Sequence, residues 1–184
     1  MVEETIKDLD PRLRKQLENA EKSLARNPSY AVDICTGILT RHPGCYEVRQ
    51  ILRNAQEKTK GGKGPSSIGR FFKGVASAPW AMKAGKMVKT DPKQVLIDGE
   101  IQLNQDPNNI SAHKLIGQAA EALEMWETAV LAYQSIQRVD PANTENRLTL
   151  AKTLIAAGRP REAIKVADQI MSDQPSTEQA QDLV

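Results

Sequence analysis

The sequence contains few of the residues that build disulfide frameworks or metal clusters. Two cysteines, Cys35 and Cys45, and two histidines, His42 and His113, occur among 184 residues. Two cysteines do not make a disulfide framework. Zinc sites usually take four ligands at tighter spacings than these residues offer. We therefore expect no metal site and no cofactor, and we expect both cysteines to be ordinary buried thiols.

Aromatic residues and long apolar runs are also scarce. Aromatics make up 4% of the chain, which disfavours a β-sandwich, because that fold draws on aromatic and β-branched side chains. No apolar run approaches the roughly 18 residues that a membrane-spanning helix needs. The acidic start, MVEETIKDLD, lacks the apolar segment of a secretory signal. These absences predict a helical, cytoplasmic protein and argue against a membrane partner.

Groups that could perform catalysis are sparse in the same way. No serine or cysteine has a convincing base near it in the pattern, so nucleophilic catalysis finds no support. The glycine-rich stretch TKGGKGPSSIGRFFKG, 59–74, does not have the spacing of a phosphate-binding loop, because Gly64 follows Gly62 and Lys63 where serine or threonine is needed. We therefore expect no catalytic residues and a protein that is not an enzyme.

Charge is distributed unevenly along the chain. The formal net charge is +2, yet residues 58–97 contain nine basic groups and one acidic group. Residues 98–184 contain seven basic and thirteen acidic groups. A basic middle followed by an acidic C-terminal half gives the molecule an electrostatic direction.

What the sequence does contain is a repeat. The motifs DPNN, DPAN and QPST recur at intervals of 34 residues, so that their prolines are Pro107, Pro141 and Pro175. Between these motifs apolar residues recur with helical spacing, and each unit reads as two helices. Gly158 suits the end of a first helix, where positive φ is needed, and Pro160 suits the first turn of the next helix.

The residues at fixed places in the two clearest units resemble the tetratricopeptide repeat signature. Those places hold His113, Ile116, Gly117, Ala120, Ala129, Tyr133 and Pro141 in 110–143. In 144–177 they hold Arg147, Leu150, Ala151, Leu154, Ala163, Ala167 and Pro175. The resemblance implies an all-α fold, a right-handed tetratricopeptide-like α-solenoid of about five helical hairpins, of which the central two are irregular.

Applied to the whole chain, the register gives a division into segments and helices. The segments are a frayed N-terminus (1–9), N-terminal repeat-like helices (10–58), a basic glycine-rich turn (59–64), degenerate central units (65–107), two clear repeats (108–143 and 144–177) and the start of a capping helix (178–184). The expected helices before the clear repeats are 10–26, 28–41, 46–58, 65–77, 79–90 and 92–105. Helix 46–58 should turn Val48, Ile51, Leu52 and Ala55 inward. In helix 92–105, Gly99 and Gln102 stand where bulk is expected.

The resemblance also implies a function, since tetratricopeptide repeats commonly bind a partner segment on the concave surface lined by first helices. The protein is then an adaptor or scaffold whose partner is another protein. The corresponding positions here form a predicted peptide-binding groove: Lys114, Gln118, Glu121, Glu145, Leu148, Lys152 and Ile155. Their mixture of apolar and charged types suits a specific peptide.

The basic middle of the chain leaves an alternative open. A basic interaction patch is predicted at Lys58, Lys60, Lys63, Arg70, Phe71 and Lys73. Basic side chains neutralise phosphates and aromatic rings stack on unpaired bases, so segment 58–93 could serve a nucleic-acid-associated protein. An acidic protein is a further possible partner. In the plainer interpretation Phe72 and Trp80 belong to the repeat core and the lysines form a solvated face.

Overall fold

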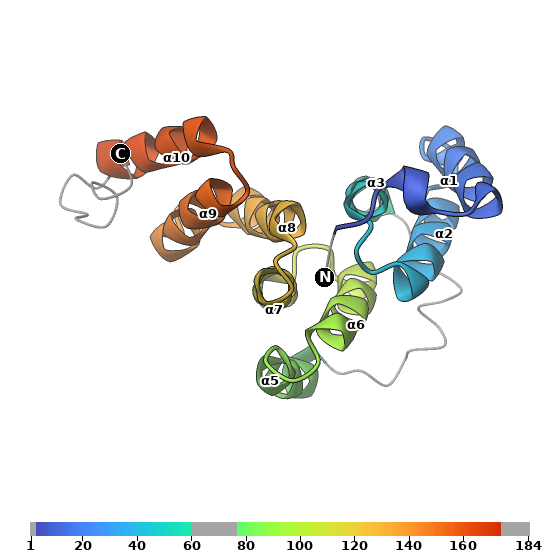
Figure 1. The fold of residues 1–184 in the computed structure, drawn as a ribbon, viewed down its shortest axis with the longest axis horizontal. Coiled ribbons are helices and arrows are strands. Elements are labelled where there is room, and N and C mark those ends of the chain that lie inside the picture. The colour runs from blue at the N-terminus through green and yellow to red at the C-terminus, as the bar shows by residue number, and fades with distance from the viewer. Residues whose placement is uncertain (1–2, 60–76, 174–184) are drawn as a thin grey trace.

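The computed structural model describes residues 3–59 and 77–173, and these residues form nine α-helices and one short 3-10 helix (Figure 1). The prediction of an all-α fold is confirmed. No described helix has the length and apolar character needed to cross a membrane. The elements are η1 (Ile6–Asp8), α1 (Pro11–Ser23), α2 (Pro28–Arg41), α3 (Tyr46–Thr59), α5 (Ser77–Met87), α6 (Pro92–Gln105), α7 (Ile110–Ala122), α8 (Trp126–Val139), α9 (Thr144–Ala156) and α10 (Pro160–Asp173).

Short polar side chains fix where most helices begin. Five helices start after an aspartate or asparagine whose side chain accepts a hydrogen bond from a backbone N–H of the first turn: Asp10, Asn27, Asp91, Asn109 and Asn143. Such a cap satisfies a donor that has no partner within the helix. Proline occupies the first helical position of α2, α6 and α10, as the sequence predicted.

Two tight turns connect the helices of the C-terminal hairpins. Gly158 has φ of 72°, so it adopts the left-handed conformation expected at the end of α9. Glu124 has φ of 58° in the turn between α7 and α8. Helix α8 begins at Trp126, two residues after this strained position.

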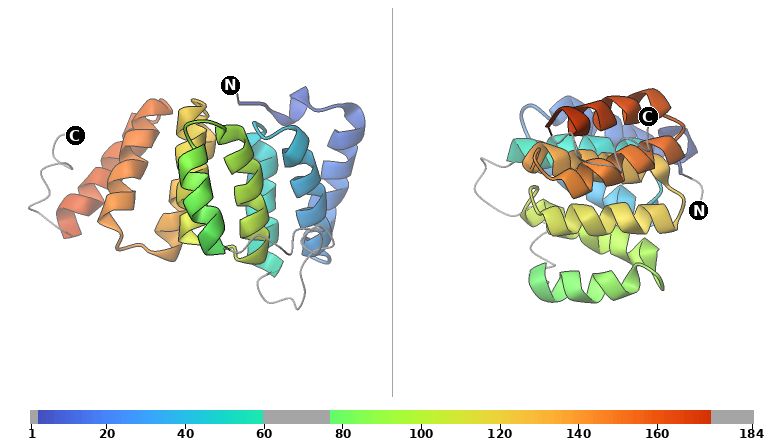
Figure 2. Two further views of the ribbon diagram at one scale, coloured as in Figure 1. Left: turned by 90° about the horizontal axis from the view of Figure 1, so that it is seen from below. Right: turned by 90° about the vertical axis from the view of Figure 1, so that its left-hand side faces the viewer.

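Neighbouring helices pack on one another in chain order, from α1 to α3 and again from α6 to α10. Figure 1 shows α5 at the edge of the molecule, next to α6 and α7, and the right-hand view in Figure 2 shows it at the edge as well. Helix α5 packs on α6 and α7, and its Trp80 is buried against them. Gly99 lies where bulk was expected, yet the space is full: a Cβ there would lie 2.6 Å from Cγ1 of Ile116. The neighbouring helix supplies the missing volume.

The apolar interior is divided into two separate cores. The N-terminal core lies among α1, α2 and α3 and includes the four side chains predicted to face inward: Val48, Ile51, Leu52 and Ala55. The C-terminal core runs through α5 to α10 and includes Trp80, Ile116, Ala129, Tyr133 and Leu154. Between the two cores, α2 contacts α6 and α3 contacts α8.

The first residues differ from the frayed N-terminus that the sequence suggested. Glu4 donates its backbone N–H to the Gly44 carbonyl oxygen at 2.9 Å and forms an isolated bridge with Cys45. Leu9 is buried in the N-terminal core. Residues 3–9 therefore lie against the helices, because they gain backbone pairing and one fully buried side chain.

Several predicted segments lie outside the described residues. These are nearly all of the basic turn at 59–64, most of the expected helix at 65–77, and the capping helix at 178–184.

Close helix packing gives a first prediction. A Cβ on Gly117 would lie 2.6 Å from the ring of Tyr133, so Gly117→Ala should lower the free energy of unfolding by about 1–3 kcal/mol. Gly37 is the matched control, since it is helical and exposed with nothing within 4 Å of a Cβ. Gly37→Ala should raise the same quantity by about 0.5–1 kcal/mol. Urea denaturation followed by circular dichroism measures both free energies of unfolding. If Gly117→Ala left its free energy of unfolding unchanged, the close packing of Gly117 on Tyr133 would be contradicted.

Candidate functional site

Between the two cores lies a set of buried polar side chains, which we call the buried polar layer: Arg49, Arg53, Gln56, Glu100 and Thr128. The three residues from α3 are spaced by four and then three, so they share one face of that helix. Arg49 Nε donates to Glu100 Oε1 at 2.7 Å. Arg53 Nη1 and Nη2 donate to the two oxygens of the same carboxylate at 2.5 and 2.9 Å. One carboxylate of α6 thus joins two arginines of α3.

The remaining donors of the layer extend the connection to other helices. Arg49 Nη1 donates to Thr128 Oγ1 of α8 at 3.1 Å, and its Nη2 donates to the Pro43 carbonyl oxygen at 2.8 Å. Gln56 donates to Asn104 Oδ1 at 2.7 Å, and Asn104 in turn donates to Thr36 of α2 at 2.9 Å. Four helices are therefore linked through hydrogen bonds rather than through apolar contact.

Within the layer, the charged form of Glu100 is stabilised, whereas the charged form of Arg49 is destabilised. Burial raises the pKa of the Glu100 carboxyl, but the adjacent Arg53 and Arg49 guanidinium groups outweigh burial and hold that pKa below its ordinary value. Burial lowers the pKa of Arg49, and the single carboxylate only partly compensates. A layer of this kind contributes more to a defined arrangement of the helices than to net stability, because desolvation opposes much of the attraction.

The N-terminal segment reinforces the same junction. The residue before α8, Met125, gives no side-chain cap. Glu3 fills that role from far away in the sequence: its carboxylate oxygens accept from the backbone N–H groups of Glu127 at 3.1 Å and Thr128 at 2.7 Å. A negative charge at a helix N-terminus is favourable. Glu3 therefore fastens the N-terminal helices to α8.

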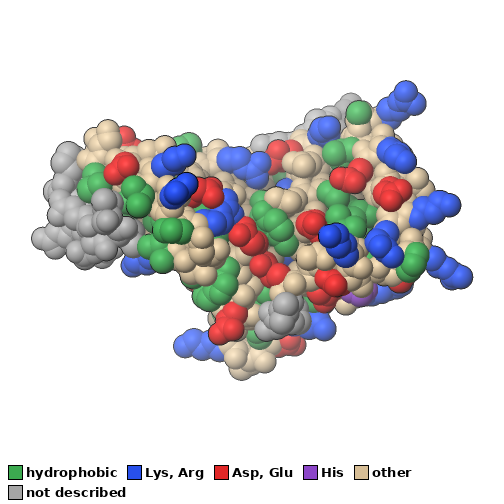
Figure 3. Space-filling view, turned by 45° about the horizontal axis from the view of Figure 1, so that its top comes forward, with side chains coloured by type: hydrophobic (Ala, Val, Ile, Leu, Met, Phe, Trp, Pro, Cys, Tyr) green, Lys and Arg blue, Asp and Glu red, His purple; other side chains and the backbone are tan. Residues whose placement is uncertain are grey.

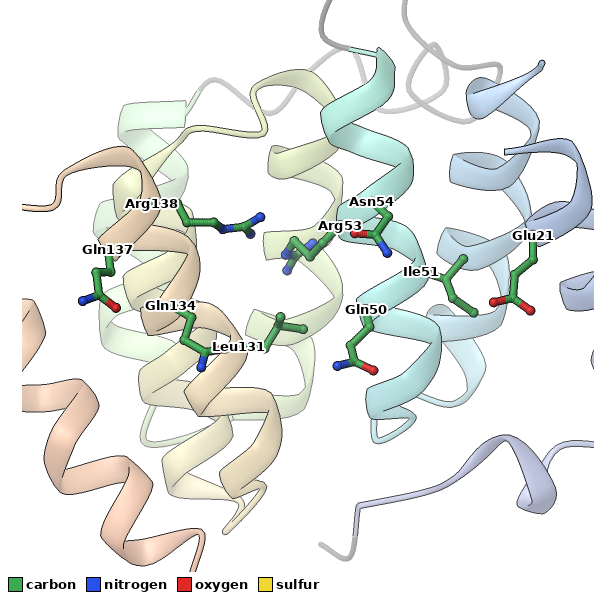
Figure 4. Close-up of a pocket in the computed structure, with 9 residues that line it drawn as sticks. All are labelled: Glu21, Gln50, Ile51, Arg53, Asn54, Leu131, Gln134, Gln137 and Arg138. Atoms are coloured by element: carbon green, nitrogen blue, oxygen red, sulfur yellow. The ribbon is translucent and has the colours of Figure 1, made fainter. Parts of the chain in front are cut away.

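Beside the layer, α3 and α8 form the walls of a groove (Figure 4). One part of it has a volume of about 670 Å³ and is lined by Glu21, Gln50, Ile51, Arg53, Asn54, Leu131, Gln134, Gln137 and Arg138. A second part of about 460 Å³ adjoins it and shares Arg53 and Arg138 with it. Figure 4 shows these two guanidinium groups pointing toward each other across the groove. We call the two parts together the α3–α8 groove.

The residues of the predicted peptide-binding groove lie together on α7 and α9, which we call the α7–α9 surface. Lys114 pairs with Glu145 at 2.9 Å, and Thr153 donates to Glu121 at 3.0 Å. These bonds show that the two first helices present one common face. Lys114, Glu145, Lys152 and Ile155 are exposed, whereas Gln118, Glu121 and Leu148 are half-buried.

The predicted basic patch is represented in the structure only by Lys58, which is exposed near the end of α3. Lys60, Lys63, Arg70, Phe71 and Lys73 lie outside the described residues. On the face of the molecule drawn in Figure 3, basic, acidic and apolar side chains are interspersed.

His113 and both cysteines are buried within the helix packing, whereas His42 is partly exposed and its Nδ1 lies 2.9 Å from Glu4 Oε2. Burial, with a smaller effect of the Arg53 charge, lowers the pKa of His113 to about 3, so its imidazole is neutral at pH 7. Its Nε2 bonds the Pro107 carbonyl oxygen at 2.9 Å. Both cysteines are free and buried, as predicted, and burial raises the pKa of Cys35 to about 12. No group of three or more possible metal ligands occurs among residues 3–59 and 77–173.

Sequence reasoning missed the buried polar layer, because arginine and glutamate on a helix are usually solvated. Arg49, Arg53 and Gln56 follow helical spacing on α3, beside the inward apolar face. Glu100 stands between Gly99 and Ile101 in a part of α6 that the structure shows to be buried. A buried carboxylate needs a partner of opposite charge, but the local sequence does not show that this carboxylate is buried.

The layer gives a second prediction. Glu100→Gln removes the charge that two buried arginines share, so the free energy of unfolding should fall by about 3–5 kcal/mol. Glu145→Gln is the control, since its pair with Lys114 is exposed and should be worth under about 1 kcal/mol. The lowered pKa of Glu100 means that its contribution exists above the ordinary value of 4.5 and disappears as pH falls through the lowered value. Urea denaturation should therefore show the difference between wild type and Glu100→Gln at pH 7, with a smaller difference at acid pH; equal stabilities at pH 7 would contradict the assignment.

Comparison with known proteins bears on the second half of this array. A tetratricopeptide repeat family model matches residues 117–184. No curated protein and no solved structure matches the chain significantly. The match covers α8, α9 and α10, where the 34-residue period is clearest. Residues 117–184 are therefore similar to the tetratricopeptide repeat, and the packing of the nine described helices is consistent with a helical repeat array of that kind.

Proposed function

We propose that the protein is a non-enzymatic adaptor that holds a segment of a partner protein on the α7–α9 surface. Tetratricopeptide repeats are in general protein–protein interaction modules. The observation that supports this use of the surface is the meeting of first-helix side chains from two successive hairpins on one common face. Because the helices are already folded, little ordering entropy is lost on this side when a partner docks.

The composition of the surface suits a segment with both apolar and charged side chains. Ile155 is 45% exposed, and Leu148 is half-buried nearby on the same helix. The Lys114–Glu145 pair is exposed on both sides, with side-chain exposures of 51% and 78%. An exposed pair is worth little within the protein. Either member can therefore exchange its partner for a charged group of the bound segment.

This proposal predicts the effect of charge changes on binding. Lys114→Glu places two carboxylates opposite each other on the α7–α9 surface, and Leu148→Glu adds a charge to its apolar part. Each should reduce partner capture by at least about tenfold, because like charges and a buried carboxylate oppose docking. Affinity purification with cross-linking measures capture and names the partner, while circular dichroism checks that the helices remain.

The matched control is Lys15→Glu, an equal charge change at an exposed position of α1. It should leave capture unchanged. Full retention of every cross-linked partner by both Lys114→Glu and Leu148→Glu would place the binding surface elsewhere.

A nucleic-acid-associated function for segment 58–93 is the second candidate. It is favoured by lysines that are all exposed on α5, α6 and the turn between them: Lys83, Lys86, Lys89 and Lys93. No acidic residue within the described ranges forms an ion pair with these four. Such a cluster attracts phosphates.

Salt dependence tests this candidate. The logarithm of the affinity for a single-stranded homopolymer should fall with the logarithm of salt concentration, and changing all four lysines to glutamine should reduce that slope by up to about 3. Filter binding or fluorescence anisotropy measures the slope. A slope that the quadruple variant leaves unchanged would exclude these lysines as phosphate contacts.

A further inference from the structure

We infer that the α3–α8 groove is a second binding site, which takes a short extended polypeptide segment carrying an acidic side chain. The site is separate from the α7–α9 surface, because its walls come from α3 and α8 and its floor from the buried polar layer. The large polar side chains of the layer lie between α3, α6 and α8 and connect these helices.

The walls of the groove carry carboxamides that suit an extended backbone. Gln50 and Asn54 are one turn apart on α3, and Gln134 and Gln137 line the groove from α8. A carboxamide both donates and accepts hydrogen bonds. An extended chain presents N–H and C=O groups along both edges, whereas a helix has already paired its own. Amides on both walls therefore favour an extended segment.

The groove also has a place for one carboxylate. Arg53 lies at the floor, and Arg138 reaches toward it from the rim (Figure 4). The Nε–H of Arg53 has no hydrogen-bond partner among the described residues. Arg138 pairs with Glu57, but both side chains are about half exposed, at 52% and 46%. A carboxylate between the two guanidinium groups would form charge-assisted hydrogen bonds and would replace Glu57 at small loss.

The charged residues that line the groove favour a polypeptide, rather than a nucleic acid, as its ligand. Among the described residues, the lining includes two arginines and two glutamates, Glu21 and Glu57, with no lysine and no Phe, Tyr or Trp. Successive phosphates would meet those glutamates, and the lining offers no Phe, Tyr or Trp ring for base stacking. From Gln50 to Glu57 the wall is about 10 Å long, at 1.5 Å per residue. That length matches about three extended residues, of which one would be acidic.

The experiment uses the purified full chain and a displayed library of random peptides. Selection should enrich peptides with aspartate or glutamate at one fixed position. Fluorescence anisotropy of an enriched peptide should show binding weakened about tenfold by Arg138→Gln and by the pair Gln134→Ala and Gln137→Ala. Glu57→Gln should strengthen it about threefold, because that change removes the internal competitor for Arg138. The opposite signs at Arg138 and Glu57 distinguish direct binding from loss of structure.

Lys114→Glu is the control that separates this site from the proposed adaptor surface, and it should leave the peptide affinity unchanged. The inference is overturned if no acidic sequence is enriched, or if Glu57→Gln weakens binding. It is also overturned if a single-stranded homopolymer displaces the peptide through the same residues, or if sedimentation shows that the groove joins two copies of the chain.

Discussion

A single carboxylate shared by two buried arginines determines how the two halves of this protein meet. Glu100 accepts from Arg49 and Arg53, and these three side chains stand where an uninterrupted array would place apolar contacts. Apolar cores tolerate small sliding and repacking, but a buried ion pair is satisfied only in a narrow geometry. The layer therefore fixes the angle and distance of α3 relative to α6 and α8. Glu3 adds a further restraint by capping α8.

The same constraint accounts for the difference between the two places that we propose for a partner. The hairpins formed by α7 to α10 pack through alanine, leucine and isoleucine, so their first helices present a continuous face. At the junction the arginines occupy more space than alanines would, and α3 and α8 remain apart along a groove. The regular repeats form the open α7–α9 surface, whereas the irregular junction between the two cores forms the α3–α8 groove. Binding chemistry is therefore expected to differ between the two places.

Much of the fold followed from the sequence because helix periods and caps are local. The expected helices 28–41 and 92–105 match α2 and α6, and Gly158 takes the predicted conformation. The junction did not follow. Arginine and glutamate on a helix are usually solvated, so Arg49 and Glu100 gave no warning of burial without knowledge of which helices meet. The capping by Glu3 depends on residues about 124 positions away in the chain, which no local pattern encodes. The α3–α8 groove was missed for that reason, whereas the α7–α9 surface came from the repeat register.

The central claim is that the buried polar layer joins two apolar cores into one cooperative unit. Native-state hydrogen exchange of the unmodified protein tests it most directly, because exchange reports the opening free energy of each helix separately. The slowest amides of α2 and α3 should share one opening free energy with those of α7 and α8. Two distinct values, with the N-terminal helices opening while α7 and α8 stay protected, would show that the layer does not couple the cores.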